Sequence, residues 1–282
     1  MEMSVLGLKT SIFPLRLLFI GLGVFLGFCV AMPSVSSAKS RVLKIAGDNS
    51  CPLNCDPKAD GVEGFIVEAA REIFKPLGWN VTYELQPWKR VIANLYAGKV
   101  DAALTAVHLN GGHDPEGIFT KVPEYTGAVC FYVAANSNWQ FNDFSKESTS
   151  LKTGVLGVIA GYDYPPEMQS YIDAHKHDGK IDVTTSQDGA NLAFKKLASG
   201  RIDFFLTLDI FAKYRLSRLA LTDKVKVNKC PIKKVNLYIL FGKKNKNSQE
   251  LADAWDSSYE AFLKSDKGKS LLRKYDLKHP LE

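Results

Sequence analysis

Two successive series of alternating strands and helices constrain the fold of this chain more than any other feature of its sequence. A short apolar strand at 42–46 leads through a loop to helically spaced apolar residues at 65–77, and a second strand follows at 81–85. The same succession begins again with a strand at 154–159. Neighbouring parallel strands need a long crossover, which is usually a helix, so the pattern predicts an α/β fold with parallel sheets.

The two series share a motif where a helix ends and the next strand begins. LYAGKVD at 95–101 and LASGRID at 197–203 both place a glycine, a basic residue, an apolar residue and an aspartate in succession. A glycine ends a helix readily because it adopts the left-handed conformation without strain. The repetition predicts two similar α/β lobes, although helix capping by itself produces the same residues in unrelated turns.

Two long apolar strands are expected, one at 127–135 between these series and one at 235–242 after the second series. Two strands that cross between two lobes predict a hinge, which lets a cleft close over a ligand. We therefore assign 39–129 together with 242–282 to a discontinuous first lobe, and 130–241 to a second lobe.

The first 38 residues, 1–38, are typical of a cleaved secretory signal peptide. A basic stretch with Lys9 and Arg16 precedes an apolar run at 17–30, and small and polar residues follow as far as Ala38. The run is shorter than the roughly 20 residues that a membrane-spanning helix needs, which disfavours the alternative of an uncleaved membrane anchor. We expect a periplasmic protein of about 244 residues without stable membrane insertion.

Four cysteines remain after such a cleavage, an even number in a chain bound for an oxidising compartment, and disulfides are expected. The sequence leaves their connectivity open. We expect Cys51 to pair with Cys55 across a short loop. We expect Cys130 to pair with Cys230, because both lie near the hinge strands. A zinc site is the rival interpretation, but no second cysteine or histidine pair at zinc-ligand spacing accompanies them, so no metal is predicted.

Charge and motifs exclude several other classes of protein. The net charge is +6, but the lysines are scattered among acids and form no basic block with interleaved aromatic residues, which argues against nucleic-acid binding. The chain has no glycine-rich phosphate loop, Gly-x-Ser-x-Gly elbow or His-Glu-x-x-His helix. His175 and His177 diverge on the expected helix and are interpreted as a polar helix end. The sequence predicts neither an enzyme nor a cofactor.

Five short segments occur in an order and spacing that are typical of one protein family. They are LKIAGD at 43–48, GF at 64–65, GKVDA at 98–102, the glycine-bounded segment 154–161 and GRID at 200–203. In these segments the chain resembles the periplasmic solute-binding proteins of family 3, which serve polar amino acid ABC transporters. PWKR at 87–90 is similar to a divergent branch with a Pro-Trp-x-Arg motif. The resemblance implies a type II, Venus-flytrap periplasmic binding protein, a monomer that captures a small polar molecule and delivers it to an inner-membrane permease.

Two other functions are compatible with the same fold. A closed receptor can dock on a membrane kinase or chemoreceptor instead of a permease, and the sequence does not separate sensing from transport. A periplasmic dehydratase also uses this fold, but such an enzyme needs an acid of raised pKa beside an anionic substrate. No residue can be assigned that role from the sequence.

In the first lobe, the resemblance assigns ligand contacts to a helix start and to a strand end. Trp88 matches the aromatic residue that lies against the ligand, with burial in the core of the lobe as the alternative. Arg90 lies about 200° further around the helix, so it reaches the cleft only if the helix starts at this point. Thr105 and His108 fall where the family has hydrogen-bonding residues. His113 replaces a carboxylate-binding arginine, and is either a weaker ligand contact or a solvent-facing residue.

In the second lobe, Tyr162 and Asp163 follow Gly161 at a strand-to-helix turn that meets a carboxylate in the family. Asp163 would repel an anion and attract a cation. Asp209 lies one residue beyond the usual ammonium-binding acid; we expect a β-bulge to return it to the cleft, and the alternative is that this contact is lost. Together with Asp48, these acids favour a cation, and aromatic rings would add cation-π contacts. Polyamine-like, aromatic and modified amino-acid ligands all remain open.

Overall fold

The computed structural model describes residues 41–108, 114–144 and 149–281. The signal peptide predicted for 1–38 and the candidate ligand contact His113 lie outside the described residues. Within the described ranges, no helix combines the length and the hydropathy needed to cross a membrane.

The first lobe is built on the parallel strands β1, β2 and β3. β1 pairs with β2 on one side and with β3 on the other. Helix α2 connects β1 to β2, and α3 connects β2 to β3, as the alternation of strands and helices predicts. The elements are β1 Arg41–Gly47, α1 Pro57–Asp60, α2 Phe65–Phe74, η1 Lys75–Leu77, β2 Trp79–Leu85, α3 Trp88–Tyr96, β3 Ala102–Val107, β4 Gly117–Phe119, α7 Ser248–Lys264 and α8 Asp266–Lys274.

The second lobe repeats this arrangement. β6 pairs in parallel with β7 and with β8, and helices α4 and α5 supply the two crossovers. Helix α6 follows β8 directly and leads towards the strand that returns to the first lobe. The elements are η2 Ser150–Thr153, β6 Leu156–Ile159, α4 Pro166–His175, β7 Ile181–Thr184, α5 Gly189–Ala198, β8 Phe204–Leu208 and α6 Asp209–Arg218.

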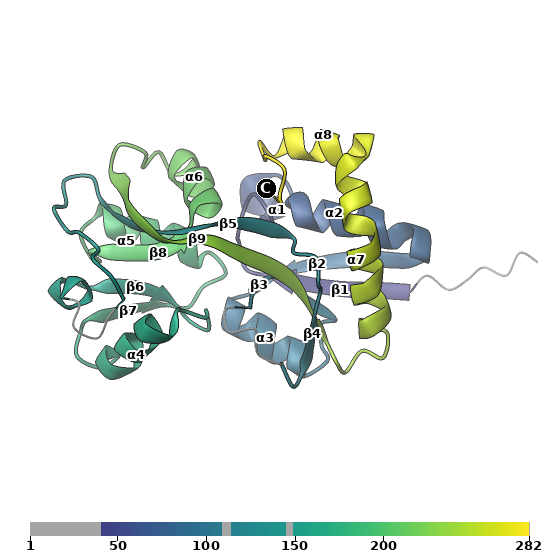
Figure 1. Cartoon of the computed structure of the whole chain (residues 1–282), viewed down its shortest axis with the longest axis horizontal. Helices are drawn as coiled ribbons and strands as arrows, with labels where there is room; N and C mark the ends of the chain where they lie inside the picture. Colours follow the sequence, from purple (N-terminus) through teal and green to yellow (C-terminus); the bar gives the residue numbers. More distant parts are fainter. Residues whose placement is uncertain (1–40, 109–113, 145–148, 282) are drawn as a thin grey trace, which may run out of the picture. The chain divides into compact units, whose positions relative to one another are not determined.

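Strands β5 (Tyr125–Ala134) and β9 (Val225–Gly242) join the two lobes. They pair with each other in antiparallel fashion, while β9 also pairs with β3 and β4, and β5 also pairs with β8. The strand order is β2-β1-β3-β9-β5-β8-β6-β7, and both joining strands can be followed from one lobe to the other in Figure 1. The predicted two-lobed α/β fold is confirmed, and the residue limits assigned to the lobes stay a prediction.

Strand β9 is longer than the apolar pattern indicated. A strand was predicted at 235–242, whereas β9 already begins at Val225. Its first half pairs with β5 alone among the described strands and carries the exposed side chains of Lys226 and Lys229. Lysines on an edge strand discourage pairing with other chains. They also interrupt the apolar run by which a strand is recognised in a sequence.

The core of the first lobe forms where α2 and α7 pack together. Phe74 of α2 stacks on Trp255 of α7 with 6.5 Å between the ring centroids, and Trp255 stacks on Tyr259 at 4.2 Å. All three side chains are completely buried. Apolar residues repeat at helical spacing in both helices, so each helix presents one continuous apolar face to the other.

Gly64, one of the residues that carried the family resemblance, is required by a close approach of two backbone segments. Its φ is +107°, and a Cβ at this position would lie 2.4 Å from the carbonyl oxygen of Leu53. The N–H of Ile66, in the first turn of α2, donates a hydrogen bond of 2.8 Å to the same oxygen. A glycine therefore lets the start of α2 dock against the loop that follows β1.

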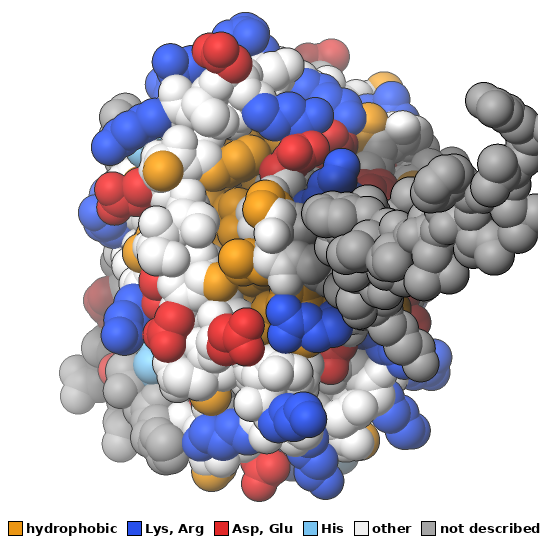
Figure 2. Space-filling view, turned by 90° about the vertical axis from the view of Figure 1, so that its right-hand side faces the viewer, with side chains coloured by type: hydrophobic (Ala, Val, Ile, Leu, Met, Phe, Trp, Pro, Cys, Tyr) orange, Lys and Arg blue, Asp and Glu red, His pale blue; other side chains and the backbone are white. Residues whose placement is uncertain are grey.

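Charged side chains are dispersed over the face drawn in Figure 2. Lysine and arginine side chains lie among acidic and hydrophobic side chains there and form no single basic block. For this face, the arrangement agrees with the solvated surface expected from the scattered lysines of the sequence.

Among the described residues two disulfides are present, and they join the pairs expected from the sequence. Cys51 is bonded to Cys55, four residues later, in the loop after β1. Cys130 of β5 is bonded to Cys230 of β9, 100 residues later. The second disulfide therefore ties together the two strands that join the lobes.

The two disulfides should contribute unequally to stability. Replacing Cys130 and Cys230 by alanine should lower the free energy of unfolding by about 5 kcal/mol, because that bond closes a long loop of the unfolded chain. Replacing Cys51 and Cys55 should lower it by only about 2 kcal/mol. Urea unfolding without a reductant measures both losses, and equal losses would contradict an origin in loop closure.

Candidate ligand-binding cleft

A cavity of about 70 Å³ lies between the two lobes. Both lobes and both joining strands contribute to its wall, which is mostly apolar. At about 10–15 Å³ for each water-sized group, it holds roughly five to seven such groups, the size of a compact ligand. The lining residues are Asp48, Ser50, Trp88, Thr105, Val107, Val129, Tyr162, Asp163, Tyr164, Pro165, Leu206, Thr207, Leu208, Phe211, Ile232, Val235 and Leu237.

Asp48 is the most buried acid of this wall. It follows β1 directly, and its carboxylate accepts hydrogen bonds from the hydroxyl of Ser50 at 2.9 Å and from that of Tyr162 at 2.6 Å. Burial raises the pKa of Asp48, while these hydrogen bonds and the positive charge of Arg215 oppose the rise. The bond from Tyr162 joins the two lobes at the cavity.

Trp88 and Tyr162 bring aromatic surface to the cavity from different lobes. Their ring centroids are 6.2 Å apart and their planes are nearly perpendicular. Trp88 is the first residue of α3, is 9% exposed and also packs with Val91 and Leu95. It satisfies both interpretations made from the sequence, since it lines the cavity and belongs to the core of the first lobe.

Asp163 lines the cavity from the turn between β6 and α4. Asp163 is exposed as a residue, but partial burial of its carboxyl group raises the pKa of that group, and the negative charge of Asp114 in the first lobe raises it further. Asp114 accepts a hydrogen bond of 2.8 Å from the hydroxyl of Tyr96. The described residues of the wall thus include two aspartates and no lysine, arginine or histidine, a composition that favours a cation over an anion.

Thr105 lines the cavity at a strained point of β3, where its φ is +57°. Its backbone N–H donates to both carboxylate oxygens of Glu124, at 3.0 and 3.3 Å. The left-handed conformation is uncommon for a β-branched residue, so this contact helps to hold the turn. Glu124 is completely buried, and burial raises its pKa to about 8, against a smaller opposing effect of the hydrogen bond from Thr105.

Arg90 and His108 do not line the cavity. Helix α3 does begin at Trp88, the condition under which Arg90 was expected to reach the cleft, but Arg90 is exposed, since two residues along a helix correspond to a turn of about 200°. His108 stacks on Phe119 with 4.4 Å between ring centroids, and meets the edge of Tyr238 at 6.4 Å. It belongs to an aromatic group beyond the end of β3.

The prediction of a β-bulge before Asp209 was wrong. β8 pairs with β5 in continuous register from Phe204 to Leu208, and Asp209 then begins helix α6. Its exposed carboxylate accepts hydrogen bonds from the N–H of Ile210 at 2.8 Å and from that of Ala128 at 3.4 Å. An acid after a strand is also favourable at the start of a helix, and Asp209 has that role.

Several residues of the cleft escaped prediction. Ser50 and Thr207 bring hydroxyl groups to the wall, and Glu124 supports it from behind. A serine within a loop and a threonine within an apolar strand carry no recognisable local signal. Glu124 did carry a recognisable signal in the sequence, because it is an acid that directly precedes the long apolar strand β5.

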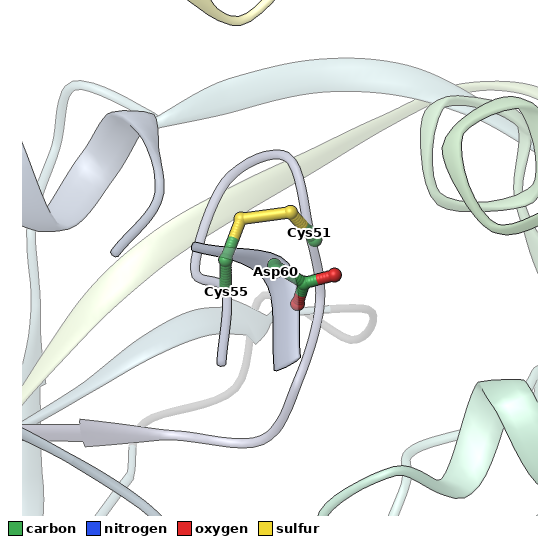
Figure 3. A group of neighbouring side chains, drawn as sticks. All are labelled: Cys51, Cys55 and Asp60. Atoms are coloured by element: carbon green, nitrogen blue, oxygen red, sulfur yellow. A yellow bond between two sulfur atoms is a disulfide. The ribbon is translucent and has the colours of Figure 1, made fainter. Parts of the chain in front are cut away.

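Cys51, Cys55 and Asp60 have the spacing of a metal site, since one potential ligand atom of each lies within 4.8 Å of the others. Figure 3 shows the disulfide between the two sulfur atoms and the carboxylate of Asp60 beside it. The sulfur atoms are bonded to each other, and Asp60 forms an ion pair with Arg215 at 3.2 Å. The group is therefore engaged in protein contacts, and it does not support a metal centre.

Comparison with known proteins gives one family. The family described as bacterial extracellular solute-binding proteins, family 3, matches residues 43–278. The histidine-binding periplasmic protein of Salmonella typhimurium strain LT2 is 23% identical over 189 residues, which cover 67% of this chain and 68% of that protein.

Two solved structures share the fold. A putative L-cystine ABC transporter protein from Listeria monocytogenes has a TM-score of 0.67 at 17% identity, and the match covers 86% of this chain and 100% of that one. A histidine kinase sensor domain with similarity to periplasmic binding proteins has a TM-score of 0.66 at 17% identity, with coverages of 83% and 96%.

Glu124 should make stability depend on pH. In the unfolded chain a glutamate ionises near pH 4.5, whereas in the folded protein Glu124 keeps its proton until about pH 8. Its contribution to stability is therefore complete below pH 4.5 and is lost as the pH rises to 8. Between pH 5 and pH 8, the free energy of unfolding of the parent protein should fall by a few kcal/mol through Glu124, and Glu124→Gln should not show this fall. Urea unfolding at each pH measures this loss, and an unchanged slope in the variant would contradict it.

Proposed function

Because this chain belongs to the bacterial extracellular solute-binding proteins, family 3, we propose that it is a receptor that captures a small solute between its two lobes. One observation carries the proposal, namely the cavity that both lobes line. At its wall, the hydrogen bond from Tyr162 to Asp48 connects the two lobes. A ligand that contacts both lobes stabilises the closed arrangement, since separation of the lobes would break half of its contacts.

The ligand that suits this cavity is a compact cation with an apolar body. The carboxylates of Asp48 and Asp163 supply acceptors for an ammonium group, and the apolar strand residues surround the rest of the molecule. Burial makes the ionised form of Asp48 unfavourable when no cation is present. A bound ammonium group would compensate that penalty and lower the pKa of Asp48 again.

An ordinary α-amino acid fits this wall less well, because it also brings a carboxylate. The described lining residues offer no guanidinium or ammonium group to bind that carboxylate. An amine, or an amino acid whose carboxylate is modified, avoids the mismatch. This restricts the amino-acid-like solutes of the sequence prediction to their cationic members.

Delivery to an inner-membrane ABC permease is the destination that family membership favours for the captured solute. The predicted signal peptide would place the protein in the periplasm, where such a permease collects its solutes. A binding role also agrees with the similarity to a histidine-binding periplasmic protein, to a putative L-cystine ABC transporter and to a sensor domain. We propose that this chain releases its ligand unchanged.

Sensing is the second candidate function, and the similarity to a histidine kinase sensor domain favours it. In that role the closed protein would dock on a membrane kinase. Permease and ATPase genes beside this gene would favour transport, whereas a neighbouring kinase gene would favour sensing. Co-purification with the membrane protein encoded alongside would decide between them.

A thermal-shift comparison tests the ligand class. Isopentylamine, 3-methylbutanoate and leucine share a branched apolar body and differ in their charged groups. At 100 times its Kd, a ligand adds about 2.7 kcal/mol to stability, which raises the Tm of a protein of this size by roughly 5–10 °C. The amine should produce the largest shift at equal concentration. A larger shift with 3-methylbutanoate or leucine would contradict the assignment.

Asp48→Asn should weaken binding of isopentylamine by about 10-fold to 100-fold, because a charge-assisted hydrogen bond becomes a neutral one. Asp209→Asn is the matched control, since Asp209 lies outside the cavity wall and its replacement should leave Kd unchanged. Calorimetric titration measures both values. Equal losses in the two variants would mean that net charge, and not Asp48, determines affinity.

A further inference from the structure

A second set of contacts joins the lobes outside the cavity wall, and Arg215 of α6 lies at its centre. The Nη1 atom of Arg215 is 3.2 Å from the carboxylate of Asp60 in α1 of the first lobe. Its Nη2 atom donates to the carbonyl oxygen of Asn49 at 3.1 Å and also bonds the Asn49 side-chain oxygen. The Arg215 and Asp60 side chains are only 2% and 5% exposed, so this is a buried ion pair between the lobes.

Asn49 of the first lobe also contacts a second element of the second lobe, the start of α5. Its backbone N–H donates to the carbonyl oxygen of Gln187 at 2.8 Å, and its side-chain amide donates to the carboxylate of Asp188 at 2.8 Å. Gln187 and Asp188 directly precede α5. One asparagine of the first lobe is thus held between the start of α5 and the side of α6.

The position of Asn49 in the chain connects these contacts to the cavity. Asn49 lies between Asp48 and Ser50, both of which line the cavity wall. Within this short segment, Asp48 and Ser50 therefore face the cavity, and Asn49 between them contacts Arg215. If α6 moved away from Asn49, the same movement would separate Asp48 from its hydrogen-bond donor Tyr162.

The segment that receives Arg215 is held rigidly on the first lobe. The disulfide between Cys51 and Cys55 closes the loop immediately after it, with Asp60 beside the disulfide (Figure 3). The side-chain amide of Asn54 donates to the carbonyl oxygen of Asp48 at 2.6 Å. Movement of the lobes is therefore expected to break the contacts of Arg215 and not to distort this loop.

From these contacts we propose that Arg215, Asp60 and Asn49 form a latch that holds the cleft closed before ligand arrives, with Arg215 as a positioning residue for ligand binding. The assignment rests on the proposed receptor function, because it concerns how that receptor closes. Opening hydrates both charges of the pair, which offsets much of their attraction, so the latch favours the closed state without locking it. Removal of the arginine alone leaves Asp60 buried without its cation, and this favours the open state.

Small-angle X-ray scattering of the ligand-free full-length mature protein tests the latch without reference to any ligand. Arg215→Met should increase the radius of gyration towards that of an open form. Arg201→Met removes an exposed arginine from the same lobe and should leave the radius unchanged. The double variant Arg215→Met with Asp60→Asn should open no further than Arg215→Met, because both changes remove the same ion pair. An unchanged radius in Arg215→Met would overturn the latch.

Affinity and folding complete the experiment. Arg215→Met should weaken binding of isopentylamine at least tenfold, with Arg201→Met unchanged, because part of the binding free energy then closes the lobes. If isopentylamine binds neither variant nor the parent protein, the ligand class fails while the scattering result still decides the latch. If Arg215→Met does not fold, Asn49→Ala removes the side-chain contacts and keeps the ion pair. Asn49→Ala should then show the increased radius, and an unchanged radius would overturn the latch.

Discussion

Both lobes depend on the pairing of β5 with β9. These two strands make the only continuous sheet connection between β3 on one side and β8 on the other within the described chain. Their register shifts at three points between Gly127 and Tyr132, and each irregularity bends a strand locally. The disulfide between Cys130 and Cys230 ties the strands together in the same region. The irregularities of register and the disulfide therefore lie in the same stretch, where the two strands connect the lobes.

Buried polar groups are concentrated at the junction of the lobes, where a closed cleft removes them from water. Arg215 has a carboxylate partner, and Asp48 has two hydroxyl donors and a nearby positive charge. Glu124 accepts a hydrogen bond from a backbone N–H, which lowers its pKa, but burial raises the pKa by more. The hydrogen bond from Tyr162 to Asp48 and the ion pair of Arg215 with Asp60 both cross between the lobes, so both contacts depend on the closed arrangement.

The sequence located some residues of the cleft well and others poorly, and the reason lies in what local patterns report. Trp88 starts a helix after Pro87, and Tyr162 lies in a strand-to-helix turn, so both positions follow from the order of elements. His108 and Asp209 also lie at strand ends, but one stacks in an aromatic group and the other begins a helix. Only the direction of each side chain separates these outcomes, and a shift of one residue reverses it on a strand.

Periodicity along the chain was enough to predict the α/β alternation, the two lobes and the two joining strands, and the oxidising compartment was enough to expect disulfides. Which cysteines pair was left open by the sequence and was shown by the structure. Only the folded chain shows that Asp48 and Asp163 face the cavity, and that the positive charge of Arg215 lies near Asp48. Arg215 and Asn49 are 166 residues apart, and no spacing rule brings them together. Their contact exists because two separately folded lobes meet, and the residues at such a meeting are selected by the packing of whole elements, not by their neighbours along the chain.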